Sequence, residues 1–405
     1  MKILFVSGLY PIQKIEELRK LSHNELQSAP NVYQWAVLEG LLKNEVDVEV
    51  ISFPFLPCFP MKYSRIYTPD SDIFIGDIKV GKMLSYNAFV LCKQYSIANK
   101  LRMYLKHWLD HNYEKEQDIW ILSYTPYSCF AKPIIELKNE YPRIKYCAII
   151  ADLVDDATNS SFDLSIPKRL QAIMEQKAVW ASYEGIDKFV LLSKQMEEKI
   201  PYAKGKSIVV EGLVSNVDNE SVNLKINDSK IVLYTGSLQD FTGVLDLVEA
   251  FRTTSDNTFK LVICGKGPLE HIIKSHSEED SRIEYVGNIP REEAVLLQKQ
   301  ATILVNPRKP TNTLTRYSFP SKTMEYMASG TPMLGYKLEG IPEEYYEYMF
   351  IPKDLTRETL ADSLNNILSL SPQELRAFGI KAKEFIREKK EASRQMHRLL
   401  QFLEA

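Results

Sequence analysis

Residues 316–335 constrain the fold of this chain more than any other stretch, because they combine a loop, a helix and a strand. Ser321 is predicted to cap a helix, and apolar residues recur after it at helical spacing. Gly330 ends the helix, since glycine tolerates the left-handed conformation that follows a helix C-terminus. Residues 331–336 then form a short apolar strand. This order is half of an αβ unit and predicts an α/β domain.

The start of this helix is a candidate anion site. A helix N-terminus presents unpaired N–H groups and a positive dipole end, and here Ser321, Lys322 and Thr323 add polar and charged side chains. Glu325 lies one turn further on, where its carboxylate can accept hydrogen bonds from the two hydroxyls of a ribose. The pattern favours a nucleoside diphosphate site. An ordinary capped helix with a surface glutamate gives the same local pattern.

The same stretch resembles the donor-site signature of family 4 glycosyltransferases, in the GT-B superfamily. Residues 325–333 read Glu-Tyr-Met-Ala-Ser-Gly-Thr-Pro-Met, and residues 340–343 read Gly-Ile-Pro-Glu, as in that signature. The loop at 319–322, Phe-Pro-Ser-Lys, is similar to a variant found in bacterial surface-polysaccharide transferases. Tyr317 replaces the family's first glutamate, which usually contacts the donor sugar.

Three further loops in the second half resemble donor-site loops of the family. Each follows a predicted strand, and glycines there let the backbone approach a ligand closely. The resemblance implies that the third loop holds the nucleotide base with backbone groups. The donor-binding candidates in these loops are Gly236, Ser237, Gly265, Lys266, Gly267, Asn288 and Ile289.

The charge for the diphosphate has to come from elsewhere in this chain. Ser237 and Thr242 stand where the family often has basic residues. We therefore assign Arg308 and Lys322 to stabilising the negative charge that develops on the leaving phosphate.

The first half has the strand–helix rhythm of the family but not its signature. Gly8 ends the first apolar strand, and the resemblance places it at the interdomain cleft. Asp152 follows the buried strand at 144–151, and ligands of open α/β sheets bind beyond the carboxyl ends of strands. We assign Asp152 to a hydroxyl of the sugar or acceptor. A simple turn or helix-cap aspartate remains the other interpretation.

Composition limits the class of protein. The 405 residues are 45% hydrophobic and 25% charged with a net charge of −3, which is typical of a globular protein and gives no basic field for nucleic acid. No apolar run reaches the ~18 residues of a membrane span. Five scattered cysteines without metal-ligand spacing favour the cytoplasm. The Asp70-Ser-Asp72 triplet is interpreted as a chance match to a metal motif.

Residues 79–109 are locally basic. They contain six lysines and arginines, no acidic residue, and apolar residues that recur every seven positions, at 84, 91, 98 and 105. The pattern predicts a basic amphipathic helix, which can lie on an anionic membrane. A helix that packs on its own sheet and exposes a basic face fits equally well.

These features predict a GT-B fold: two Rossmann-like α/β/α domains facing a cleft, with a C-terminal helix crossing back to the first. We expect residues 1–212 with 385–405 to bind the acceptor, and residues 213–384 to bind the nucleotide sugar. The resemblance implies a retaining glycosyltransferase that uses a nucleotide sugar, more specifically a UDP-sugar, and needs neither a cofactor nor an essential metal.

The expected acceptor is a saccharide, lipid-linked, in bacterial capsule, exopolysaccharide or O-antigen synthesis. The protein would then be cytoplasmic, and peripheral on the inner face of the plasma membrane. Two alternatives remain from the sequence: a GT-B nucleotide-sugar epimerase, and a non-catalytic nucleotide-sugar-binding subunit.

Overall fold

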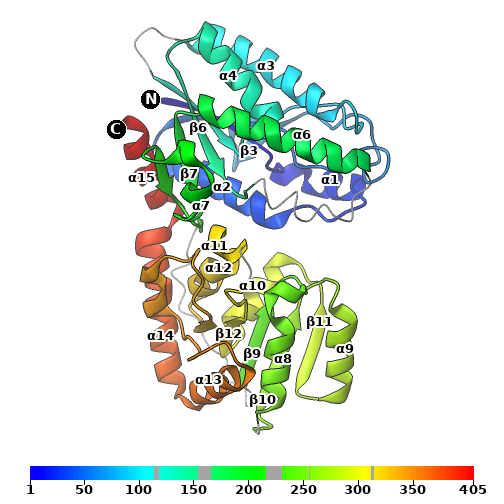
Figure 1. Cartoon of the computed structure of the whole chain (residues 1–405), viewed down its shortest axis with the longest axis vertical. Coiled ribbons are helices and arrows are strands. Elements are labelled where there is room, and N and C mark those ends of the chain that lie inside the picture. The colour runs from blue at the N-terminus through cyan, green and yellow to red at the C-terminus, as the bar shows by residue number, and fades with distance from the viewer. Residues whose placement is uncertain (114–117, 154–165, 216–229, 255, 312–313) are drawn as a thin grey trace. The chain divides into compact units, whose positions relative to one another are not determined.

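The computed structural model of the chain describes residues 1–113, 118–153, 166–215, 230–254, 256–311 and 314–405. It divides into two compact units, Met1–Ser215 with Ala392–Ala405, and Asn216–Glu391. Each unit is an α/β structure built on its own sheet, as the sequence predicts. Figure 1 labels the elements of both.

Unit 1 contains a sheet in the order β3-β4-β2-β1-β5-β6-β7-β8, counted over the described residues. Its pairs are parallel except for the hairpin of β3 and β4. The central strands are continuous apolar runs because both faces of such a sheet are covered. The strands are β1 (Lys2–Ser7), β2 (Asp47–Ser52), β3 (Ser71–Ile75), β4 (Ile78–Met83), β5 (Ile119–Tyr124), β6 (Ile144–Ile150), β7 (Lys188–Leu191) and β8 (Ser207–Val209).

The helices of unit 1 connect these strands and cover them. Helix α4 contacts both α3 and α6, and the three lie side by side in Figure 1. The α-helices are α1 (Ile15–Leu21), α2 (Ser28–Lys43), α3 (Lys93–Asn112), α4 (Ser128–Glu140), α6 (Ile166–Ser182), α7 (Met196–Lys199) and α15 (Ala392–Glu404). Short 3-10 turns are η1 (Ile12–Lys14), η3 (Tyr183–Gly185) and η4 (Pro201–Ala203).

The C-terminal helix α15 belongs to unit 1 although the chain reaches it from unit 2. It packs on α2, with Met396, Leu399 and Leu403 buried. The approach is close, because a Cβ on Gly40 of α2 would lie 2.6 Å from the Ala392 carbonyl oxygen. Burial of this apolar face fixes the last turns of the chain on the first unit.

Unit 2 contains a parallel sheet in the order β11-β10-β9-β12-β13, again over the described residues. The strands are β9 (Lys230–Thr235), β10 (Phe259–Cys264), β11 (Ile283–Gly287), β12 (Ile303–Asn306) and β13 (Met333–Gly335). The α-helices are α8 (Val244–Arg252), α9 (Glu270–Glu279), α10 (Arg291–Gln300), α11 (Leu314–Tyr317), α12 (Ser321–Ser329), α13 (Arg357–Ser369) and α14 (Pro372–Phe385). Shorter helical turns are η5 (Asp240–Thr242), η6 (Glu343–Tyr348) and the π-helical η7 (Ile386–Lys390).

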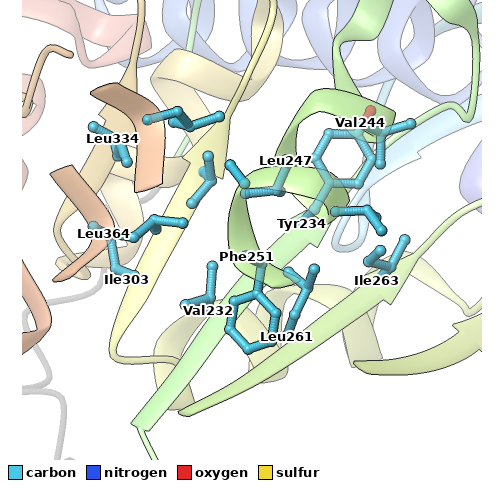
Figure 2. Close-up of a cluster of buried hydrophobic side chains, with 14 of the residues drawn as sticks. Val232, Tyr234, Val244, Leu247, Phe251, Leu261, Ile263, Ile303, Leu334 and Leu364 are labelled. Carbon is cyan, nitrogen blue, oxygen red and sulfur yellow. The ribbon is translucent and has the colours of Figure 1, made fainter. Parts of the chain in front are cut away.

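A hydrophobic core supports one face of this sheet. Figure 2 shows side chains of β9, β10 and β12 meeting those of α8 and α13. Val232, Leu247, Leu261, Ile303 and Phe251 are completely buried there. Each such side chain stabilises the unit by roughly 1.5–3 kcal/mol. The packed sheet is the rigid base from which the loops at its carboxyl edge project.

The helix predicted after residue 320 forms, but its start differs from the prediction. Ser321 is the first residue of α12, and Pro320 occupies the cap position without a side-chain capping hydrogen bond. The prediction that Ser321 caps this helix is therefore wrong. Proline presets an extended entry with φ −68° and ψ 109°, so the turn begins one residue earlier. Gly330 ends the helix with φ 80°, as predicted.

The prediction of one long basic helix over residues 79–109 is also wrong. Residues 78–83 are strand β4, and the helix begins only at Lys93. Leu101, Leu105 and Trp108 of α3 are buried within unit 1, and the Trp108 indole donates a 2.7 Å hydrogen bond to Glu49 on β2. These three side chains are thus part of the protein's own core, whereas Leu91 of the predicted stripe is exposed. No helix in the described ranges is long and apolar enough to span a bilayer.

Candidate functional site

Glycines pack three loops together at the carboxyl edge of the unit 2 sheet. A Cβ on Gly265, whose φ is 148°, would lie 1.7 Å from the Gly236 carbonyl oxygen, and a Cβ on Gly267 would lie 2.3 Å from that of Leu238. The Gly265 amide donates a 2.8 Å hydrogen bond to the carbonyl of Gly287. Side chains would force these backbones apart. The result is an edge lined by main chain, where a ligand can approach closely.

Arg308 enters this edge from the end of β12. A Cβ on Gly243 would lie only 2.1 Å from the Pro307 carbonyl oxygen. The absence of a side chain at Gly243 therefore makes room for the loop that carries Arg308. The Arg308 guanidinium lies 5.3 Å from the centre of the Phe241 ring. Its Nε is buried and has no hydrogen-bond partner within the described part of the chain. Burial lowers the pKa of Arg308, but an arginine stays protonated. A half-buried cation with an unused donor fits an anionic ligand.

Lys309, the next residue, differs from Arg308 in being paired with a carboxylate. Lys309 forms a 2.8 Å ion pair with Asp246, which also accepts a 2.7 Å hydrogen bond from Arg357. Its charge is therefore already compensated within unit 2. Of the two adjacent cations, Arg308 is the one that the described residues leave without a carboxylate.

Helix α12 brings Lys322 and Glu325 to the same edge. The Lys322 ammonium lies 3.2 Å from Glu325 Oε1, which also accepts a 2.5 Å hydrogen bond from the Gln298 amide. Gln298 is fully buried and donates in addition to the Thr235 hydroxyl, at 2.9 Å. This chain of contacts links α12 and α10 to the end of β9. Both contacts to Glu325 fall on one oxygen, and Oε2 has no hydrogen bond to any described residue.

Glu325 remains a carboxylate in these surroundings. Burial alone would raise the pKa of Glu325, but the Lys322 ammonium and the Gln298 amide outweigh burial and hold it below the ordinary value. The group therefore stays charged at neutral pH. An ionised carboxylate with one free oxygen can accept hydrogen bonds from ligand hydroxyls.

The other predicted donor-site residues occupy more varied positions in unit 2. Ser237, Lys266, Asn288 and Ser321 are exposed, and Ile289 is half-buried. Thr323 is different: its side chain is fully buried and its amide donates to the Pro320 carbonyl at 2.9 Å. Thr323 therefore lies in the first turn of α12, with its side chain turned into the protein rather than to solvent.

Gly8 and Asp152 lie in unit 1, at the carboxyl ends of β1 and β6. A Cβ on Gly8 would lie 2.3 Å from the Phe55 ring, and its amide donates a 2.6 Å hydrogen bond to the buried Gln34. Asp152 keeps exposed surface, and its carboxyl has no hydrogen bond or ion pair with the described residues. Burial of the carboxyl group nevertheless raises the pKa of Asp152 above the ordinary aspartate value. Residues 155 and 156, also acidic, lie outside the described residues.

The two aspartates of the Asp70-Ser-Asp72 triplet have other partners. Asp72 pairs with Lys79 at 2.8 Å across the β3–β4 hairpin, and Asp70 accepts a 2.6 Å hydrogen bond from the Ser85 amide. The described residues contain no cluster of three or more potential metal ligands. The triplet is accounted for by these structural contacts.

Sequence reasoning missed Gln298, Phe241 and Tyr326. Gln298 positions Glu325, and Phe241 supports the Arg308 guanidinium. Tyr326 is buried, and its hydroxyl accepts a 2.9 Å hydrogen bond from the Thr235 amide. A polar glutamine inside an otherwise ordinary helix was the one available signal, because a buried polar side chain needs a partner.

Residues 229–369 match the family model described as Glycosyl transferases group 1. The matched region contains all the donor-site candidates of unit 2. No curated protein matches the sequence.

Solved structures resemble the whole chain at low sequence identity. A sucrose-phosphate synthase from Thermosynechococcus elongatus has a TM-score of 0.65 and 17% identity, covering 100% of this chain and 99% of its own. HepE from Anabaena, in complex with UDP, has a TM-score of 0.59 and 12% identity, covering 99% of this chain and 100% of its own. A trehalose-phosphate synthase (UDP-forming) from Burkholderia xenovorans, in complex with glucose-6-phosphate, has a TM-score of 0.65 and 11% identity. The match covers 100% of both chains. The prediction of a GT-B fold is confirmed.

Proposed function

We propose that this protein is a retaining glycosyltransferase that transfers a sugar from a UDP-sugar to a saccharide acceptor. The observation that carries the proposal is the edge of unit 2, inside the region matched as Glycosyl transferases group 1. There Arg308 has an unused buried donor, and Lys322 and Glu325 lie together on α12. Similar structures bound to UDP support the choice of nucleotide.

The proposed reaction assigns each group a task. The bond between the sugar C1 and the diphosphate oxygen breaks, and its electron pair leaves with the phosphate. The acceptor oxygen forms the new bond to C1, and its proton passes to the released diphosphate or to solvent. Arg308 and Lys322 stabilise the charge on the leaving phosphate, and Glu325 accepts hydrogen bonds from the ribose. Asp152 binds a hydroxyl of the transferred sugar or the acceptor.

The test is a product assay with UDP-sugars and a saccharide pool. Formation of a new glycoside together with UDP, at an unchanged rate in EDTA, is the expected result. Turnover of the UDP-sugar without an acceptor, seen as an epimeric sugar by NMR, would instead identify an epimerase. Binding of UDP without turnover in any acceptor pool would identify a non-catalytic subunit.

Glu325→Ala is expected to weaken UDP binding without unfolding the protein. Loss of a charge-assisted hydrogen bond costs ~1.5–3 kcal/mol, or roughly 10- to 150-fold in affinity. Calorimetric titration of UDP measures the effect, and a thermal melt checks folding. Glu284→Ala, an exposed glutamate on β11, is the matched control. Equal affinities for wild type and Glu325→Ala would exclude the ribose role.

We further propose that the acceptor is lipid-linked, in bacterial surface-polysaccharide synthesis, and that the protein works in the cytoplasm at the membrane surface. The buried face of α3 is not available for this. The segment around the start of α3 is available to a membrane, because it exposes apolar side chains. Leu91 is 83% exposed, Tyr95 76% and Phe89 37%. Lys82 and Lys100 are exposed and unpaired within the described residues. Exposed apolar side chains with nearby cations suit an anionic lipid surface.

The membrane proposal predicts co-sedimentation with anionic vesicles at low salt and release at high salt. The double variant Leu91→Ser, Tyr95→Ser should reduce the pelleted fraction at least fivefold. Leu170→Ser is the matched control, because Leu170 of α6 is 58% exposed in the same unit. Lys93 is unsuitable for such a test, since its ammonium donates a 2.5 Å hydrogen bond to the Leu56 carbonyl. Equal recovery in the supernatant with and without vesicles would refute the membrane proposal.

A further inference from the structure

The turn after β5 in unit 1 has a strained backbone. Thr125 has φ 62°, a left-handed conformation that β-branched residues rarely adopt. Three hydrogen bonds hold it: the Thr125 amide to the Ile149 carbonyl at 2.9 Å, the Thr125 hydroxyl to the Tyr124 carbonyl at 2.6 Å, and the Ser123 hydroxyl to the Thr125 carbonyl at 3.2 Å. Such strain persists where the surroundings enforce it, and it gathers at functional sites.

This turn places two tyrosines in an aromatic cluster. The Phe55 ring lies 6.1 Å from Tyr124 and, edge-on, 5.7 Å from Tyr127, measured between ring centroids. The Tyr33 ring lies 5.7 Å from that of Tyr124, also between centroids. Tyr127 is 41% exposed, so the cluster offers part of one ring to solvent. Tyr124 is only 5% exposed, yet its hydroxyl has no hydrogen bond with the described residues.

The cluster lies beside Asp152. The charge of this carboxylate contributes to raising the pKa of both Tyr124 and Tyr127, after burial, so the three groups are neighbours. The raised pKa of Asp152 itself has burial as its cause, with no nearby cation lowering it. The described residues thus bring together an unpartnered carboxyl, an unpartnered buried hydroxyl and an exposed aromatic ring, without a positive charge that acts on the carboxyl.

A ligand for this arrangement can be described by its chemistry. A partly exposed aromatic ring packs against apolar C–H surface, and a pyranose ring presents such a face. A carboxylate and a tyrosine hydroxyl then bond to sugar hydroxyls. A phosphate would instead bring a second negative charge next to a buried carboxylate on which no cation of the described residues acts, which is unfavourable.

Given the glycosyltransferase function proposed above, we infer that the acceptor is an uncharged glycoside, not a sugar phosphate. Its apolar face packs on Tyr127, and its hydroxyls bond to Asp152 and Tyr124. In this respect the chain would differ from the trehalose-phosphate synthase whose structure holds glucose-6-phosphate. Tyr127 becomes a specificity-determining residue for the acceptor.

Ligand-observed saturation-transfer NMR tests this inference on the full chain with UDP bound. The probes are a set of methyl hexopyranosides and the matching hexose 6-phosphates. At least one neutral glycoside should bind at least tenfold more tightly than every phosphate. Tyr127→Ala should weaken that binding at least tenfold and Tyr127→Phe less than threefold, with UDP affinity unchanged. Tyr202→Ala is the matched control, because Tyr202 is 47% exposed elsewhere in unit 1.

The outcomes separate the inference from the proposed function. If UDP binds but the phosphates bind as tightly as the glycosides, or neither class binds, the inference is overturned and the transferase function stands. It is also overturned if Tyr127→Ala binds the glycoside as wild type does. If UDP itself does not bind, both the function and the inference are overturned.

Discussion

Replacing Asp152 with asparagine is expected to lower the rate of sugar transfer at least a hundredfold while leaving UDP affinity unchanged. Asparagine keeps the shape of the side chain but removes the charge. The Asp152 carboxyl has no partner among the described residues, so a substrate hydroxyl is left to occupy it. A hydrogen bond from a sugar hydroxyl to this carboxylate that is stronger in the transition state than in the ground state contributes roughly 3 kcal/mol or more to transition-state stabilisation.

The pH dependence provides the control for this prediction. Because burial raises the pKa of Asp152, the carboxylate is lost as the pH falls through a value above the ~3.9 of an ordinary aspartate. The wild-type rate should therefore fall on the acid side at a higher pH than an exposed aspartate would give. Asp152→Asn should lack this acid limb in its residual activity. A variant with wild-type rates and an unchanged profile would remove Asp152 from the mechanism.

Arg308→Ala and Lys322→Ala are each expected to reduce turnover at least tenfold, and together by more. Each loss corresponds to ~1.4 kcal/mol or more of transition-state stabilisation. Arg308 has the clearer structural case, because its buried Nε has no partner in the described residues. Lys322 already contacts Glu325, so its removal also frees that carboxylate and should weaken UDP binding. Steady-state rates at saturating UDP-sugar separate the two effects.

Lys309→Ala is the matched control for these cations. It removes a positive charge one residue from Arg308, but that charge is paired with Asp246. Its turnover should stay within about twofold of wild type. Wild-type rates for both Arg308→Ala and Lys322→Ala would place the phosphate-stabilising charge elsewhere.

The sequence predicts the strands of this protein well because both faces of its parallel sheets are covered. In β5, for example, residues 119–122 are all apolar and the whole strand is buried. Glycine positions are equally informative: Gly330 and Gly265 stand where the backbone takes a positive φ. The order of strand, glycine loop and helix therefore predicts both units and the edge at which we propose that the nucleotide sugar binds.

Other features depend on tertiary contacts that no local pattern contains. The basic stretch at 79–109 has the periodicity of a surface helix, yet Trp108 is fixed to Glu49 from a distant strand. Gln298 reaches Glu325 from another helix. By sequence, Tyr124 is an ordinary strand residue. Its proposed role in acceptor binding depends on Asp152, which follows the neighbouring strand β6. Pairings of this kind are set by the fold, so only the structure identifies them.

Calorimetric titration of UDP, GDP and ADP into the full-length protein tests the central claim, that unit 2 binds a UDP-sugar, most directly. We expect a single UDP site per chain and at least tenfold weaker binding of GDP and ADP. Arg308→Ala should weaken the binding of UDP more than that of uridine, because its partner is the diphosphate. Absence of UDP binding, or tighter binding of GDP or ADP, would contradict the account.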